Sequence, residues 1–147
     1  YRAVTKNYLA LATVALGLTN LLGGCRSAPT PVSYARAFPT DITQKEVLNI
    51  QVFRRTTTLE FTNTTAKAFG PSTLWLNMWY SRPIKGLAVG ESVSLPLADF
   101  RDRYSAKFRG GGFFASEPPE KLVLAQIETA RADAPAELAG LIVVVSE

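Results

Sequence analysis

The sequence predicts an all-β domain, built as a small antiparallel β-sandwich or barrel and preceded by an N-terminal hydrophobic membrane helix. Three observations support this prediction. The chain has 147 residues, of which 47% are hydrophobic, so it is long enough for one domain with a buried core. After residue 40, apolar and polar residues alternate over short segments, which is the period of half-buried strands. Glycine and proline residues separate these segments, whereas one continuous apolar run lies near the N-terminus.

The first half of the domain contains three predicted strands. Residues 47–54 alternate between apolar and polar side chains. Residues 57–63 are rich in β-branched threonine, and the short link to the preceding segment predicts a hairpin. Residues 73–80 follow a Gly-Pro loop and carry large side chains on both faces, so we expect a central strand there that Pro83 ends.

The second half shows three further strand patterns. Residues 92–97 alternate again, and Pro96 should place this strand at a sheet edge or at its own end. Residues 121–128 form a predicted strand, and the apolar run 141–145 predicts a strand buried on both sides. Six to eight short strands separated by turns are typical of an immunoglobulin-like sandwich or a barrel. The connecting segments are a helical turn within 98–104, a glycine-broken loop that enters a short strand over 108–114, and a long turn over 130–139.

Residues 1–25 have the layout of an export signal. Arg2 and Lys6 precede an apolar run over residues 8–22, and no further charge lies before Cys25. A basic segment followed by a short apolar run is typical of a secretory signal. Extended at both ends, the run would also be long enough to cross a bilayer as a helix, with the basic residues on the cytoplasmic side. Either interpretation exports the rest of the chain.

The export segment ends in Leu22-Gly23-Gly24-Cys25. This sequence resembles the lipobox of bacterial lipoproteins, in which an aliphatic residue and two small residues precede the cysteine that is lipidated. The resemblance implies that Cys25 is acylated and becomes a new N-terminus; an ordinary signal anchor is the alternative. Four stretches of the body carry a second resemblance: residues 61–65, 72–77, 81–84 and 111–114. In them the chain is similar to a group of short bacterial lipoproteins, which implies export and a compact β domain but carries no activity.

Residues 26–40 are interpreted as a proline-rich tether between the anchor and the domain 41–147. Its three prolines disfavour helix and interior strand and give the segment a polyproline-like stiffness. Tyr34 and Phe38 are apolar for a free linker. We therefore expect these two side chains to dock either on the domain or on a partner.

The composition excludes several chemistries. There is no histidine and there is a single cysteine, which removes Ser-His-Asp and Cys-His catalysis, His-ligated metals and haem, and an internal disulfide. Catalysis by carboxylates needs two of them across a cleft, whereas the acidic residues here are scattered near loops. The sequence predicts no enzyme activity, no cofactor and no metal site.

The domain itself is electrically neutral. Residues 41–147 contain twelve basic and twelve acidic residues, so the net charge of +4 comes from the segment before them. A nucleic-acid-binding protein should carry a basic patch on its folded part, so we expect no nucleic-acid partner. Arg101 and Arg103 belong to a basic cluster that is interleaved with aspartates. Such a cluster is typical of a solvated face, and a patch that docks anionic lipid or an acidic partner is the alternative.

Aromatic side chains supply the remaining candidates for a site. Most of the set Trp75, Trp79, Tyr80, Phe113 and Phe114 is expected in the core, and a stacking platform for sugars or a hot spot for a partner is the alternative. At least one of the two tryptophans should be exposed, because the opposite face of segment 73–80 is already filled. The candidate partner contacts are Tyr34, Phe38, Trp75, Trp79, Arg101 and Arg103.

Together these features predict a non-enzymatic accessory or scaffold subunit that is anchored on the periplasmic side of a bacterial cell envelope. Its β domain would pack on integral membrane subunits of a larger complex, as extrinsic subunits of respiratory or photosynthetic complexes do by analogy. Membrane lipid would hold the N-terminal segment. The alternative is a free envelope lipoprotein that binds a glycan, peptidoglycan or a small ligand.

Overall fold

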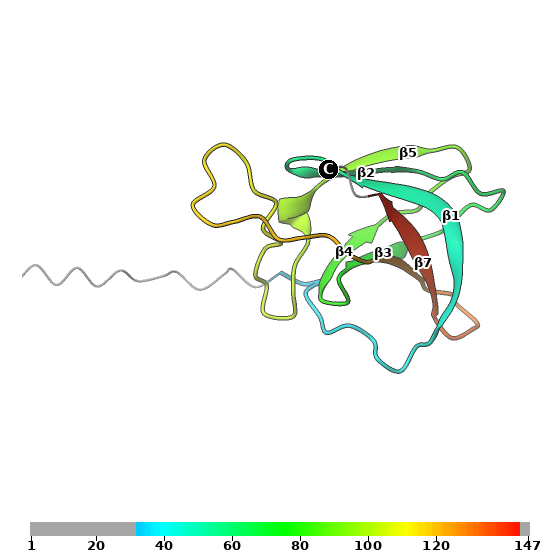
Figure 1. The fold of residues 1–147 in the computed structure, drawn as a ribbon. Helices are drawn as coiled ribbons and strands as arrows, with labels where there is room; N and C mark the ends of the chain where they lie inside the picture. Colours follow the sequence, from blue (N-terminus) through cyan, green and yellow to red (C-terminus); the bar gives the residue numbers. More distant parts are fainter. Residues whose placement is uncertain (1–31, 145–147) are drawn as a thin grey trace, which may run out of the picture.

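The computed structural model describes residues 32–144, in which seven strands form one curled sheet that resembles half of a barrel (Figure 1). Neighbouring strands follow the order β4-β3-β6-β7-β1-β2-β5. One short 3-10 turn, η1, follows the last residue of β5. The strands are β1 Gln44–Arg54, β2 Thr58–Thr62, β3 Ser72–Leu76, β4 Tyr80–Ile84, β5 Ser92–Pro96, β6 Ala125–Thr129 and β7 Glu137–Val144, and η1 spans Leu97–Asp99.

The all-β class is confirmed, and the antiparallel sandwich is corrected. Strands β1 and β7 pair in parallel, so the sheet is mixed. The parallel pair arises because the last strand of the chain inserts between β6 and β1 and joins two antiparallel groups. The predicted N-terminal membrane helix and Cys25 lie outside the described residues. Between residues 32 and 144, no helix is long and apolar enough to cross a bilayer.

The predicted strand over 73–80 is wrong, because the chain reverses within it. Asn77 and Met78 have φ angles of 54° and 55°, and the chain turns there from β3 into β4. The Asn77 side chain holds the turn: its amide nitrogen donates to the Lys121 carbonyl, and its oxygen accepts from the Val123 amide. Pro83 does not end a strand but lies inside β4, where an edge position tolerates a missing N–H.

The hairpin between β1 and β2 and the edge position of β5, with Pro96 as its last residue, are confirmed. Three predictions in the second half need correction. The glycine-broken segment contains no strand after the glycines, and the strand predicted over 121–128 begins only at Ala125. Strand β7 starts earlier than predicted, at Glu137, and Ile142 within it is 39% exposed rather than buried. These positions differ because a strand's neighbours, rather than its own apolar run, determine what it buries.

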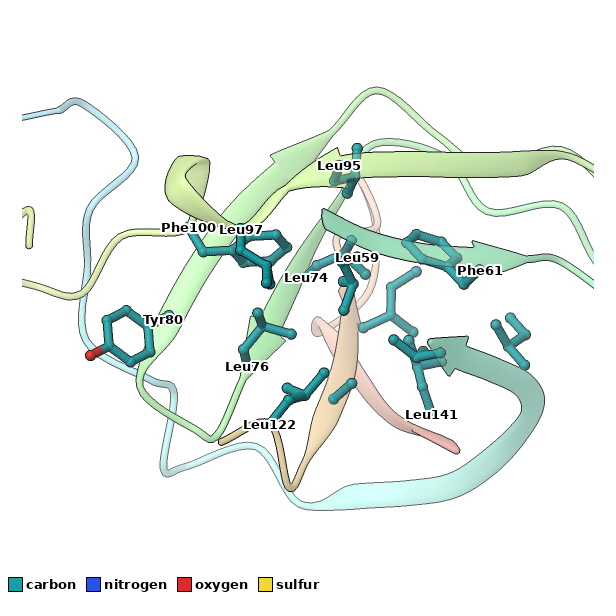
Figure 2. Close-up of a cluster of buried hydrophobic side chains, with 14 of the residues drawn as sticks. Leu59, Phe61, Leu74, Leu76, Tyr80, Leu95, Leu97, Phe100, Leu122 and Leu141 are labelled. Carbon is teal, nitrogen blue, oxygen red and sulfur yellow. The ribbon is translucent and has the colours of Figure 1, made fainter. Parts of the chain in front are cut away.

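The core lies inside the curve of the sheet. Side chains from β2, β3, β5, β7 and η1 point toward one another there, as Figure 2 shows. Phe100 and Phe108, which follow η1, close one side of this core, and both are almost fully buried. Residues of this core include Ile50, Val52, Leu59, Phe61, Leu74, Leu76, Leu95, Leu97, Phe100, Phe108, Ile127 and Leu141.

A second, smaller buried layer lies on the other face of the sheet. Residues 32–43, which we call the strap, cross that face in an irregular extended path. Phe38 packs edge-to-face on Trp75 with 5.2 Å between the ring centroids, and the Arg36 guanidinium lies 4.8 Å from the same ring. Trp75 is thereby fully buried, and its indole N–H donates to Glu128 at 2.7 Å. The part of the predicted tether that the structure describes therefore docks on its own domain.

The sheet has two distinct ends. Strands β1, β3, β5 and β7 finish at the end where β2, β4 and β6 begin. We call this the loop end, because it carries the turn 55–57, the turn 77–79 and the long connection 97–124 between β5 and β6. The connection forms the two loops on the left of Figure 1.

Candidate functional site

An aromatic and cationic stack is exposed at the loop end. Trp79 comes from the turn between β3 and β4, and Arg103 and Tyr104 come from the loop after η1. The Arg103 guanidinium carbon lies 5.2 Å from the centre of the Trp79 ring and 4.8 Å from that of Tyr104. Trp79 remains 43% exposed and Tyr104 64% exposed. We call these three residues the Trp-Arg-Tyr stack.

The loop under this stack is held in one conformation by Asp102. One oxygen of the buried Asp102 carboxylate accepts hydrogen bonds from the Tyr104 and Ala106 amides, each at 2.8 Å. The other oxygen accepts the indole N–H of Trp79 at 3.3 Å. Ser105 has a φ of 67°, and its carbonyl accepts a hydrogen bond from Arg101. The stack is therefore organised before any partner arrives, which lowers the entropy lost on binding.

Of the six candidate partner contacts, the structure brings Trp79 and Arg103 together in the exposed stack. Phe38, which belongs to the strap, instead packs on Trp75, which lies in β3 beneath the strap. The Tyr34 hydroxyl donates to the Asp99 carbonyl at 2.6 Å, so this side chain also binds its own domain. Arg101 is half-buried and exchanges backbone hydrogen bonds with Ser81.

Two phenylalanines of the aromatic set, most of which was expected in the core, are instead almost fully exposed. Phe113 and Phe114 are 96% and 94% exposed, and their rings meet only each other, edge-to-face at 5.0 Å. They follow Gly111 and Gly112, whose φ angles of 86° and 124° suit glycine. The glycine run before them and the Pro118-Pro119 pair after them are the sequence features that could have indicated a projecting loop.

The base of this projecting loop is fixed by polar contacts. Arg109 forms ion pairs with Glu117 at 3.4 Å and with Glu120 at 3.9 Å. The Tyr80 hydroxyl donates to Glu120 at 2.8 Å. Burial of the phenol, followed by the adjacent Glu120 carboxylate, raises the pKa of Tyr80 well above its ordinary value. The loop therefore projects from a rigid base.

Exposed apolar side chains are concentrated at the loop end. Nine large hydrophobic residues are exposed in the part of the chain that the structure describes, and all four aromatic ones belong to this end. Val47, Val89 and Ile142 lie elsewhere on the sheet and its connections. The loop-end members are Met78, Trp79, Tyr104, Phe113, Phe114 and Val123.

A separate groove crosses the outer surface of β1, β2 and β5. It has a volume of about 600 Å³ and is lined mainly by amide and hydroxyl side chains, among them Asn49, Gln51 and Thr62. Its one carboxylate, Glu60, is paired with Arg55 at 3.0 Å. Within residues 32–144, no group of three acidic or cysteine side chains is placed to hold a metal ion.

Comparisons of this chain with protein-family models, with curated proteins and with solved structures each found no match.

Proposed function

We propose that this protein is a non-enzymatic accessory or scaffold subunit, anchored by its N-terminal segment on the periplasmic side of a bacterial membrane. In this proposal the β domain binds an integral membrane protein through the Trp-Arg-Tyr stack. The anchor itself is inferred from the basic residues, the apolar run and the lipobox-like sequence at Cys25.

The observation that carries the proposal is the exposure of this stack. Tryptophan, tyrosine and arginine are the residue types that dominate the binding energy of protein interfaces. Here they form one contiguous group from the turn 77–79 and the loop after η1, and Asp102 bonds to both segments. Arg103 makes no ion pair with a described residue, so its charge is available to a partner carboxylate.

The test is co-purification from native membranes in mild detergent. Arg103→Ala and Tyr104→Ala should each reduce the amount of bound integral membrane protein by about tenfold or more, as expected for hot-spot residues. Arg131→Ala is the matched control, since Arg131 is also exposed but lies between β6 and β7 at the opposite end. Equal recovery of partner by all variants, or a native chain that purifies as a free monomer, would contradict the proposal.

The groove over β1, β2 and β5 favours the alternative function, a free lipoprotein that binds a glycan or peptidoglycan. Its amide and hydroxyl side chains could bind sugar hydroxyls, and Phe53 could contact a sugar ring. Binding of peptidoglycan fragments that is lost in Gln51→Ala but kept in Arg103→Ala would favour this alternative. If the native chain binds no peptidoglycan fragment, this alternative function is wrong.

A further inference from the structure

No other part of the described domain covers the two rings of the Phe113-Phe114 loop. Both rings are almost fully exposed, whereas the aromatic side chains of the core are buried. The loop is short, projects from a base fixed by Arg109, and places its two rings at the tip. Apolar side chains that project from a peripheral protein can be buried at the boundary between the headgroups and acyl chains of a bilayer.

The chain reaches the described domain at this same end. The Val32 amide donates to the Ser105 hydroxyl at 3.1 Å, and Tyr34 is bonded to Asp99, so the strap begins beside the loops of the loop end. Figure 1 shows the first coloured residues and both loops on the same side of the sheet. Val32 lies seven positions after Cys25, and such a segment spans at most about 25 Å. If Cys25 is held at the membrane, as the proposed function requires, Val32 and the loop end beside it lie within about 25 Å of the bilayer.

The charges at the loop end suit an anionic lipid surface. Arg103, Lys107 and Lys121 form no ion pair with any described residue. Of the four acidic side chains in the connection 97–124, Asp99 pairs with Arg82, and Glu117 and Glu120 share Arg109. The fourth, Asp102, is buried and accepts hydrogen bonds from two backbone amides and the Trp79 indole. Basic residues close to a membrane are attracted to anionic headgroups, and aromatic side chains favour the interfacial region.

We propose that the Phe113-Phe114 loop inserts into the interfacial region of an anionic bilayer and holds the loop end of the domain against the membrane. The lipid anchor would tether the chain, and the loop would set its orientation. The Trp-Arg-Tyr stack would then lie at the membrane surface, at the height of an integral partner. This inference rests on the anchoring part of the proposed function and adds a second, independent contact with lipid.

The test uses the full chain in vesicles of phosphatidylcholine with about 30% phosphatidylglycerol, an anionic surface like that of a cell membrane. Trp79→Phe removes the exposed native tryptophan, and the buried Trp75 stays as a constant background. Adding Phe114→Trp then places a fluorescent reporter on the loop. Val89→Trp is the matched control, because Val89 is 55% exposed and precedes β5 at the opposite end of the sheet. Quenching is measured with bromine on the lipid acyl chains.

The expected result is that brominated lipid removes most of the reporter's emission in the Phe114→Trp variant and little of it in the Val89→Trp variant. A chain that floats with the vesicles while the loop reporter stays unquenched would overturn the insertion and leave the anchor intact. A chain that does not float with the vesicles would overturn both the insertion of the loop and the membrane anchor of the proposed function. If emission of the Phe114→Trp variant is already blue-shifted in a lipid-free amphipol, protein covers the loop, and the proposal is wrong.

Chymotrypsin supplies a second measurement that needs no substitution, since it cleaves after exposed aromatic residues. Cleavage after Phe113 or Phe114 should be rapid in detergent and slow in vesicles. The variant Phe113→Ser/Phe114→Ser should keep its thermal midpoint within about 2 °C, because both rings lie in solvent. Equal cleavage of the native loop in detergent and in vesicles would contradict insertion.

Discussion

Met78 adopts a backbone conformation that costs free energy. Its φ of 55° lies in the left-handed region, which is unfavourable by about 1–2 kcal/mol for a residue with a Cβ. Asparagine followed by glycine is the preferred pair for two left-handed turn positions, and Asn77 already occupies the first. Met78 is 47% exposed, so its side chain contributes little packing.

We expect Met78→Gly to raise the free energy of unfolding by about 0.5–1.5 kcal/mol, after allowance for the greater freedom of glycine in the unfolded chain. Urea unfolding of the full chain in mild detergent measures this change. Met78→Ala is the control, because it removes the side chain and keeps the strain. Equal stability of the two variants would show that the turn is not strained.

The turn at Asn77 and Met78 explains why the alternating pattern predicted the wrong relative positions for the two tryptophans. An alternating pattern over 73–80 puts Trp75 and Trp79 on one face of one strand. The reversal at Asn77 and Met78 separates them, so that Trp75 is buried under the strap and Trp79 is exposed at the loop end. A single asparagine within an apolar run is a weak turn signal, because strand patterns carry no information on where the chain reverses.

At the scale of elements, the strap contributes to folding as well as connecting the chain. Phe38 and Arg36 cover Trp75, and Arg36 also pairs with Glu128 on β6. The apolar residues Tyr34 and Phe38 marked this segment as more than a free linker. The sequence left open whether they meet the domain or a partner, because a side chain's hydrophobicity does not identify the surface that buries it.

Phe38→Ala should lower the free energy of unfolding by about 1–3 kcal/mol, since a half-buried ring and its edge-to-face contact are lost. Trp75 emission should shift to the red as water reaches the indole. Phe113→Ala is the control and should change neither quantity, because Phe113 is 96% exposed. An unchanged Trp75 spectrum in Phe38→Ala would mean that the strap does not cover this face in solution.

For the whole molecule, local patterns predicted the class of fold but not the pairing of strands. The β1-β2 hairpin and the edge position of β5 followed from a short link and from Pro96. The parallel pairing of β1 with β7 joins segments some ninety residues apart and depends on which neighbours remain unpaired. For the candidate site, the sequence identified Trp79 and Arg103 and included Phe113 and Phe114 in a set expected mostly in the core, whereas Tyr104 was missed because only the fold places it beside Arg103.

This order of strands places a group with a shifted pKa at each end of the sheet. The free energy of unfolding should therefore fall at both extremes of pH. At the opposite end from the loops, a hydrogen bond from Lys45 on β1, followed by the charge of Arg131, lowers the pKa of Glu137 on β7. A lowered carboxyl pKa contributes stability above the unfolded pKa of about 4.3, and this is lost as pH falls through the folded value.

At the loop end the sign is reversed, because burial and Glu120 raise the pKa of Tyr80 while Asp102 adds to this and Arg109 opposes it. Above a pH of about 10 the unfolded chain releases this proton and the folded chain keeps it, so stability falls as pH rises. Urea midpoints between about pH 3 and 11 should therefore form a plateau with two declining limbs. Tyr80→Phe should flatten the alkaline limb alone, and Glu137→Gln the acidic limb alone. An alkaline limb unchanged in Tyr80→Phe would mean that the phenol is exposed to solvent, and that the base of the Phe113-Phe114 loop is not the rigid support inferred from its contacts.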